Sequence, residues 1–130
     1  MSDLSVSWER GQIFASLMPI VPPDPIVCRV WLILENQNPK EAFSKIEVPT
    51  ADVILVRNDS TLGTIPMETE WEGLLAPGRK DTIFFFKNTG SDPIFTPPCG
   101  DRVLLDFVIQ NADGYARMFR SDTLVFECAF

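Results

Sequence analysis

Apolar and polar residues alternate along most of this chain, which is the pattern of β-strands that bury one face. The clearest run is Val103 to Ile109, and a second alternating run, Leu124 to Phe130, follows the turn-forming sequence of residues 111–114. This arrangement predicts an antiparallel hairpin between the two runs. The residues expected to be buried in it are Val103, Leu105, Phe107, Leu124 and Phe126.

The same alternation predicts further strands upstream, separated by sequences rich in Pro, Gly, Asn and Asp. They cover Leu4–Trp8 continued by Gln12–Met18 after a kink at Glu9-Arg10-Gly11, then Ile26–Glu35, Phe43–Val48, Asp52–Arg57, Thr61–Ile65, Thr69–Leu75 and Thr82–Lys87. No window carries the apolar spacing of a helix free of Pro or Gly. We therefore expect one all-β domain over residues 1–130, an antiparallel β-sandwich of roughly seven to nine strands.

The strand Val30–Asn36, the strand opened by Leu75-Ala76-Pro77-Gly78 and the closing hairpin together resemble immunoglobulin-like or fibronectin-type-III-like β-sandwiches. This resemblance implies an architecture and assigns no functional residue. The antibody core triad does not fit, because Trp31 follows Cys28 on the same strand. Residues 34–39 also resemble the Asn-Pro strand end of water-stress and late-embryogenesis-abundant sandwich domains.

Composition narrows the possible functions. The net charge of −7 disfavours nucleic acid and anionic membranes as partners, since both are bound by clustered Lys and Arg. The chain contains no histidine, so it cannot build a Ser-His-Asp or Cys-His catalytic site by itself. No phosphate-binding glycine motif or calcium-loop spacing is present. We expect no catalytic residue, no metal and no cofactor.

The three cysteines, Cys28, Cys99 and Cys128, are odd in number and widely spaced, which indicates neither a disulfide framework nor a zinc site. Cys28 and Cys128 share an inward parity, and whether they are bridged stays open. The N-terminus lacks the features of a signal peptide, and no apolar run is long enough to span a bilayer. We expect a cytoplasmic protein, with a cropped ectodomain or a virion component as alternatives.

Two strands carry apolar residues on both faces. If Cys28, Val30 and Leu32 face the core, Trp31 faces outward, and the strand around Phe84 to Phe86 shows the same excess. We expect Trp31 to be covered by the N-terminal segment around Trp8 or by a second subunit.

Glu68, Glu70 and Glu72 fall on one face of a predicted strand. We interpret them as charges that protect a sheet edge from aggregation, in preference to a site of acid–base chemistry.

Two Pro-rich connections, residues 19–25 and 88–101, carry apolar residues that loops normally lack. These residues either plug the end of the core or contact a partner; with Trp31 they form our candidate binding set: Ile20, Val21, Ile94 and Phe95. The expected function is a non-enzymatic protein–protein interaction or structural assembly module, through a protein partner or self-association. The alternative is a carbohydrate-binding or other ligand-binding module, and an enzyme is a third possibility.

Overall fold

The computed structural model describes residues 3–16, 26–87, 95–112, 114 and 116–129. Within these ranges all regular structure is β: eleven β-segments are present and no helix. The segments are β1 (Leu4–Ser16), β2 (Ile26–Asn36), β3 (Phe43–Ser44), β4 (Thr50–Leu55), β5 (Thr61–Glu68), β6 (Leu74–Leu75), β7 (Lys80–Lys87), β8 (Arg102–Gln110), β9 (Ala116–Arg120), β10 (Leu124–Val125) and β11 (Glu127–Ala129). The expected all-β class is confirmed, with more and shorter segments than the seven to nine strands predicted.

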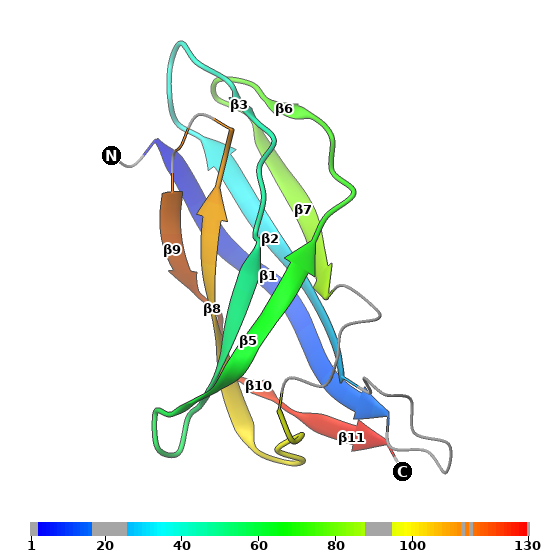
Figure 1. The fold of residues 1–130 in the computed structure, drawn as a ribbon. Coiled ribbons are helices and arrows are strands. Elements are labelled where there is room, and N and C mark those ends of the chain that lie inside the picture. The colour runs from blue at the N-terminus through cyan, green and yellow to red at the C-terminus, as the bar shows by residue number, and fades with distance from the viewer. Residues whose placement is uncertain (1–2, 17–25, 88–94, 113, 115, 130) are drawn as a thin grey trace.

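The segments form one continuous hydrogen-bonded order, β10-β8-β4-β5-β7-β2-β1-β11, with β9 also paired to β8. The sheet folds over on itself, so that β4, β5, β8 and β9 lie in front of β1, β2 and β7 (Figure 1). The turn between the two layers runs through β5, because its first part pairs with β4 while Met67 and Glu68 pair with β7. β3 and β6 form a separate two-stranded sheet.

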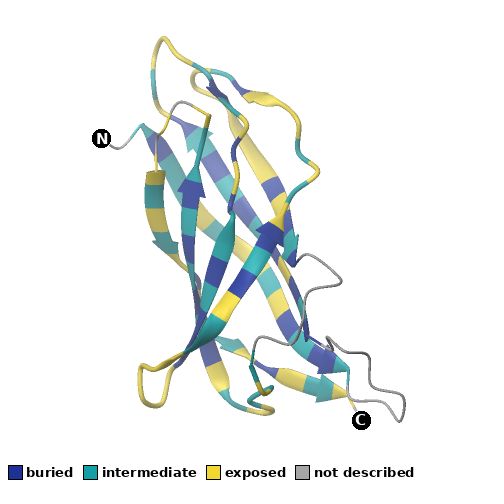
Figure 2. Ribbon diagram, viewed as in Figure 1, coloured by how far each residue is buried: buried dark blue, intermediate teal, exposed yellow. Residues whose placement is uncertain are grey.

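The core lies between the two layers and is built from alternate residues of each long strand (Figure 2). Val30, Leu32 and Leu34 of β2 are fully buried, and Phe107 is one of four fully buried residues at alternate positions of β8. Trp8 of β1 stacks on Phe107 with ring centroids 6.4 Å apart, so the layers meet through aromatic contact. Burying large apolar side chains in this way is the main driving force for folding.

Two local predictions are confirmed. The kink expected at Glu9-Arg10-Gly11 is a register shift in the β1–β2 pair between Trp8 and Arg10. The turn expected at residues 76–79 closes with a 3.0 Å hydrogen bond from the Arg79 amide to the Ala76 carbonyl. Gly78 adopts φ 73° there, the conformation that a type II turn requires at its third position.

The predicted closing hairpin is wrong about its partner strand. β8 forms its hairpin with β9, where Phe107 pairs with Phe119, and the last strand touches β8 only at Leu124 and Val125. Beyond Phe126 the chain joins β1 instead, in a parallel pair, so the fold is not purely antiparallel. Alternation shows which side chains face inward, but it carries no information about which strand lies alongside.

Burial in this region follows the prediction with one exception. Val103, Leu105, Phe107 and Phe126 are fully buried, whereas Leu124 is only half-buried. Leu124 lies in a two-residue strand that pairs with the end of β8, and its neighbour Val125 is exposed. A side chain at the edge of a sheet is covered by fewer neighbours than one at its centre.

Candidate functional site

A row of stacked aromatic rings crosses the outer face of the rear layer. Trp31 of β2 stacks on Phe84 of β7 with ring centroids 4.7 Å apart, and Phe84 stacks on Phe86 at 5.4 Å. The row forms because Trp31 and Phe84 are direct partners in the β2–β7 pair. Their neighbours along each strand are buried, so these rings point away from the core. Phe84 is exposed, while Trp31 and Phe86 are half-buried.

Arg10 covers the free end of this aromatic row. Its guanidinium carbon lies 4.1 Å from the centroid of the Trp31 ring, which is a cation–π contact. The bulge in β1 makes the contact possible, because Trp8 turns into the core and Arg10, two residues later, pairs opposite Trp31. Gly11 is needed beside it, since a Cβ at this position would collide with the Trp8 ring.

The predicted cover of Trp31 is therefore partly right. The N-terminal strand does supply it, as expected, but through Arg10 rather than through Trp8. Phe84, the partner of Trp31 in the row, remains 37% exposed. The outer aromatic face is only partly covered by the chain's own residues.

A groove of about 870 Å³ begins where the aromatic row ends, at Phe86. It lies between two stretches of chain, residues 44–49 and 67–73. These stretches part beyond a hydrogen bond from the Met67 amide to the Pro49 carbonyl, and they meet again where β3 pairs with β6. β7 lies behind this opening in Figure 1. The volume falls within the range of roughly 300–1,000 Å³ that ligand pockets occupy.

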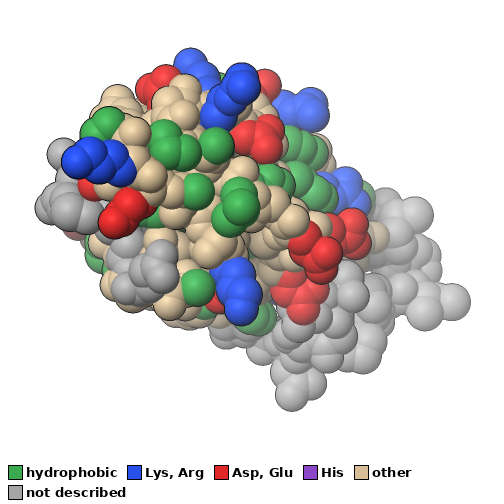
Figure 3. Space-filling model, turned by 90° about the horizontal axis from the view of Figure 1, so that it is seen from above, with side chains coloured by type: hydrophobic (Ala, Val, Ile, Leu, Met, Phe, Trp, Pro, Cys, Tyr) green, Lys and Arg blue, Asp and Glu red, His purple; other side chains and the backbone are tan. Residues whose placement is uncertain are grey.

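The groove has an apolar interior and a charged rim. Ile46, Val48 and Met67 line it as buried residues, together with half-buried Trp71 and Phe86. The charged residues on the rim are all exposed: Lys45, Glu47, Glu68, Glu70 and Glu72. From above the β3–β6 end, acidic side chains gather at one side of the visible surface beside hydrophobic ones (Figure 3). The rim therefore carries four carboxylates and one ammonium group.

Side-chain hydrogen bonds fix the wall formed by residues 69–73. The Thr69 hydroxyl donates to the Phe84 carbonyl at 2.7 Å and accepts from the Trp71 amide at 3.2 Å. The Trp71 indole N–H donates to Asp81 at 3.2 Å. These bonds hold the segment beside β7 without a regular ladder, which is why the strand predicted for Thr69–Leu75 is reduced to β6.

The predicted loop site is described only at one residue. Ile20, Val21 and Ile94 lie outside the described residues, so their role stays a prediction. Phe95 is half-buried and meets Phe126 edge to face, with ring centroids 6.2 Å apart. Because Phe126 is fully buried, this contact favours the interpretation of Phe95 as a plug of the core.

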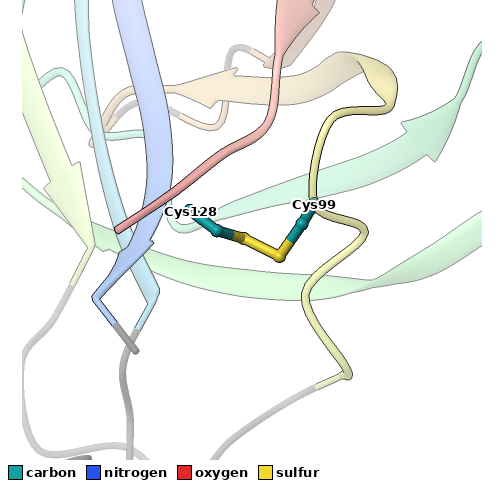
Figure 4. Close-up of a disulfide and its surroundings, with 2 residues drawn as sticks. All are labelled: Cys99 and Cys128. Atoms are coloured by element: carbon teal, nitrogen blue, oxygen red, sulfur yellow. A yellow bond between two sulfur atoms is a disulfide. The ribbon is translucent and has the colours of Figure 1, made fainter. Parts of the chain in front are cut away.

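A disulfide joins Cys99 to Cys128, with their Cα atoms 5.5 Å apart (Figure 4). It links the stretch before β8 to β11, two parts of the chain that the sequence did not place together. Cys28 is a free, buried thiol. The Cys28–Cys128 bridge that spacing left open is thus absent, because Cys128 is bonded to Cys99.

The ionisable groups with altered pKa values lie outside the groove and the aromatic row. Burial raises the pKa of Cys28 from 9.0 to about 12, and burial lowers that of Lys87. The hydrogen bond to Asp106 raises the pKa of Arg120 on β9. In the described part of the chain, no group of three or more His, Cys, Asp or Glu residues is arranged to hold a metal ion.

Sequence reasoning named Trp31 but did not name Phe84, Phe86 or Arg10 as site residues. The signal for the two Phe residues was present, since apolar residues occupy both faces of β7. Arg10 gave no signal in the sequence, because only the bulge in β1 places it over Trp31.

The described residues contain no helix long and apolar enough to cross a membrane. In comparisons with known proteins, no family model matched the sequence and no curated protein matched it significantly.

Proposed function

We propose that this domain is a non-enzymatic protein-interaction module that binds its partner through the outer aromatic face. The observation that carries the proposal is the stacked row of Trp31, Phe84 and Phe86 on the solvent side of the β2–β7 pair. The outer face of an antiparallel sheet normally carries polar residues. Contiguous apolar side chains on such a face are a feature of protein interaction sites.

The row fits a protein partner better than a carbohydrate. Sugar binding by stacking needs an open ring face, and Arg10 already lies over the face of Trp31. The second nearby indole, Trp71, uses its N–H in a bond to Asp81. The remaining members of the row are phenylalanines, which offer apolar area without a hydrogen-bonding group. Aromatic residues and arginine are the types most enriched at protein–protein contacts.

The cysteines also favour a binding role over catalysis. Cys28 is buried with its pKa raised to about 12, so its reactive thiolate form is suppressed. Cys99 and Cys128 are bonded to each other. None of the three is therefore available as a nucleophile.

We assign the fold to the immunoglobulin-like β-sandwich type as part of the same proposal. Two layers packed through alternating inward residues support this assignment. The parallel β1–β11 pair is a departure from the wholly antiparallel arrangement that the sequence suggested.

The disulfide bears on the compartment in which the domain works. Disulfides persist in oxidising compartments and are rare in the cytosol of mesophiles. The Cys99–Cys128 bond therefore favours an extracellular, periplasmic or similar setting over the cytoplasmic one that we expected from the sequence. Lysing the native host directly into denaturant and alkylating at once, with and without prior reduction, tests this setting. Two reduction-dependent thiols support an oxidising compartment, and three thiols labelled without reduction contradict it.

The proposed function is tested by selecting binders from a displayed library of random peptides and, in parallel, by probing a glycan array. Peptides that bind the wild type and lose binding to Phe84→Lys support a protein-binding face. Met118→Lys is the matched control, because Met118 is 68% exposed on β9, away from the row. Glycan binding that depends on Trp31, without any enriched peptide, would favour the carbohydrate alternative.

A further inference from the structure

The groove beside Phe86 has an unpaired strand edge along one wall. The stretch Ile46–Val48 is held to β8 on its other side, where Glu47 and Gln110 exchange two backbone hydrogen bonds of 2.8 and 2.9 Å. In such a pair, the backbone groups of the adjoining residues point to the opposite edge. For Ile46 and Val48, that edge is the one facing the groove, which both residues line.

The amides and carbonyls of Ile46 and Val48 have no hydrogen-bond partner among the described residues. Ile46 and Val48 are only 1% and 2% exposed, so a chain reaches their backbone groups only when the wall of residues 67–73 moves outward. Most buried backbone groups in folded proteins are paired, because an unpaired one costs free energy comparable to a lost hydrogen bond. An extended chain added along this edge would pair them, which is the mode called β-strand addition.

The charges of the rim select the kind of chain that fits. Glu47, Glu70 and Glu72 project from the two walls, with Glu68 beside them, and Lys45 is the single cation of the rim. The excess of carboxylates favours lysine or arginine side chains and repels acidic ones. The apolar interior accepts the alternate side chains, since successive residues of a strand point to opposite sides.

We propose that the groove binds a short extended peptide segment in which basic and apolar residues alternate, paired to the Ile46–Val48 edge. This inference deepens the proposed function, on which it rests, by naming the chemistry of the partner and a second contact surface next to the aromatic row. The two ends of the groove are closed, by the Met67–Pro49 bond and by the β3–β6 pair. Residues 45–48 of this wall lie between the two closures, and a paired strand matches them residue for residue. The bound stretch is therefore about four to five residues long.

The first test measures the affinity of a fluorescent, end-capped peptide of about six residues that alternates lysine and valine. Its counterpart with glutamate in place of lysine is the charge control. We expect saturable binding of the lysine peptide only, and at least about tenfold weaker binding to the double variant Glu70→Lys, Glu72→Lys. Single Glu70→Lys and Glu72→Lys variants, each checked by thermal melting, replace the double variant if it unfolds.

Asp122→Lys is the matched control for net charge. Asp122 is exposed, is not among the residues lining the groove, and gives the same change of charge as either single variant. Its affinity for the lysine peptide should stay within about twofold of wild type at physiological ionic strength. Equal losses in Asp122→Lys and Glu70→Lys would show attraction by overall charge and overturn the groove site.

The second test addresses the backbone pairing. Methylating the amides of alternate peptide residues blocks one hydrogen-bonding edge at a time and leaves the side chains in place. Strand addition predicts that methylation of at least one set of alternate amides abolishes binding. If both methylated peptides bind as well as the parent, the Ile46–Val48 edge is not used and the inference fails.

The outcome also separates this inference from the proposed function. Library peptides that depend on Phe84, combined with no binding of the lysine peptide, would overturn the groove inference and leave the function standing. If the library yields no peptide that depends on Phe84 and the lysine peptide does not bind, the proposed function and the groove inference are both overturned. Binding of the lysine peptide that resists Phe84→Lys and is lost in Glu70→Lys would place the partner in the groove alone.

Discussion

The side-chain amide of Asn36 donates a hydrogen bond of 2.8 Å to the backbone carbonyl of Leu75 inside the domain. The same amide donates to the Glu41 carbonyl at 2.7 Å, and the side-chain oxygen accepts from the Asn38 amide at 2.8 Å. Asn36 is fully buried, and these partners lie around the β3–β6 pair that closes one end of the groove. One polar side chain at the end of β2 therefore fixes both the strand and the groove.

Replacing Asn36 with leucine should lower the free energy of unfolding by about 2–4 kcal/mol, because the buried Leu75 carbonyl and two partly buried backbone groups would lose their partner. Urea unfolding followed by circular dichroism measures the change. Asn58→Ala is the control. Among the described residues, the Asn58 side chain bonds exposed Ser60 alone, so its loss should cost less than about 1 kcal/mol. Equal effects of the two substitutions would contradict the role given to Asn36.

The contact of Arg10 with Trp31 should be measurable as an energetic coupling. A double-mutant cycle of Arg10→Ala and Trp31→Ala should give about 0.5–1 kcal/mol, the usual size for a cation–π pair near the surface. The measurement is the free energy of unfolding of the four proteins. A parallel cycle that replaces Arg10→Ala with Arg79→Ala should give no coupling, because Arg79 belongs to the turn before β7. Absence of coupling in the Arg10 cycle would mean that Trp31 is covered by packing alone.

The Cys28 thiol should resist alkylation while the protein is folded. Raising the pKa from 9.0 to about 12 lowers the thiolate fraction near neutral pH roughly a thousandfold. Because the thiol is more acidic in the unfolded chain, Cys28 should also make stability fall as pH rises from about 9 to about 12.

Mass spectrometry after iodoacetamide treatment should therefore show one modified cysteine in urea and almost none in buffer. Comparing the alkaline loss of stability with that of Cys28→Ala isolates the contribution of this thiol. Rapid labelling of the folded protein would show that the site opens to solvent.

Loss of the Cys99–Cys128 bond should destabilise the domain by about 2–4 kcal/mol, the typical effect of a native disulfide. The reason is that the bond limits the freedom of the unfolded chain between Cys99 and Cys128. Melting with and without a reducing agent measures the effect in wild type. Cys128→Ser should melt low in both conditions, whereas Cys28→Ala should keep the sensitivity to reduction. A wild type whose melting ignores the reductant would contradict the expected stabilisation.

The sequence predicted the long strands well, because strict alternation is a strong signal when one face is buried. The strand expected over Ile26–Glu35 is β2 to within one residue, and the bulge in β1 was placed correctly. Strand neighbours were predicted less well. β9 was not predicted at all, since no residue from Ala116 to Arg120 is fully buried and its apolar pattern is weak.

The candidate site was predicted in part for a related reason. The three Glu residues at positions 68, 70 and 72 suggested a solvated strand face, and they are exposed. The groove beside them exists because the strand predicted over Thr69–Leu75 does not form there. The Trp71 amide donates to the Thr69 hydroxyl instead of to a neighbouring strand. A side chain that replaces a backbone hydrogen bond of a sheet does not change the alternation of apolar and polar residues, so the sequence pattern does not reveal it.

The parallel pairing of β11 with β1 has a consequence for the order of folding. Phe14 and Glu127 are 113 residues apart in the sequence (127 − 14), so β1 gains its second neighbour only after residues 127–129 have been synthesised. Contacts between such distant segments slow folding, because a large loop must close before they form. A nascent chain that lacks residues 127–129 leaves one edge of β1 open to pairing with other chains. Residues 127–129 therefore cover this edge of β1, and deleting them would favour aggregation during synthesis.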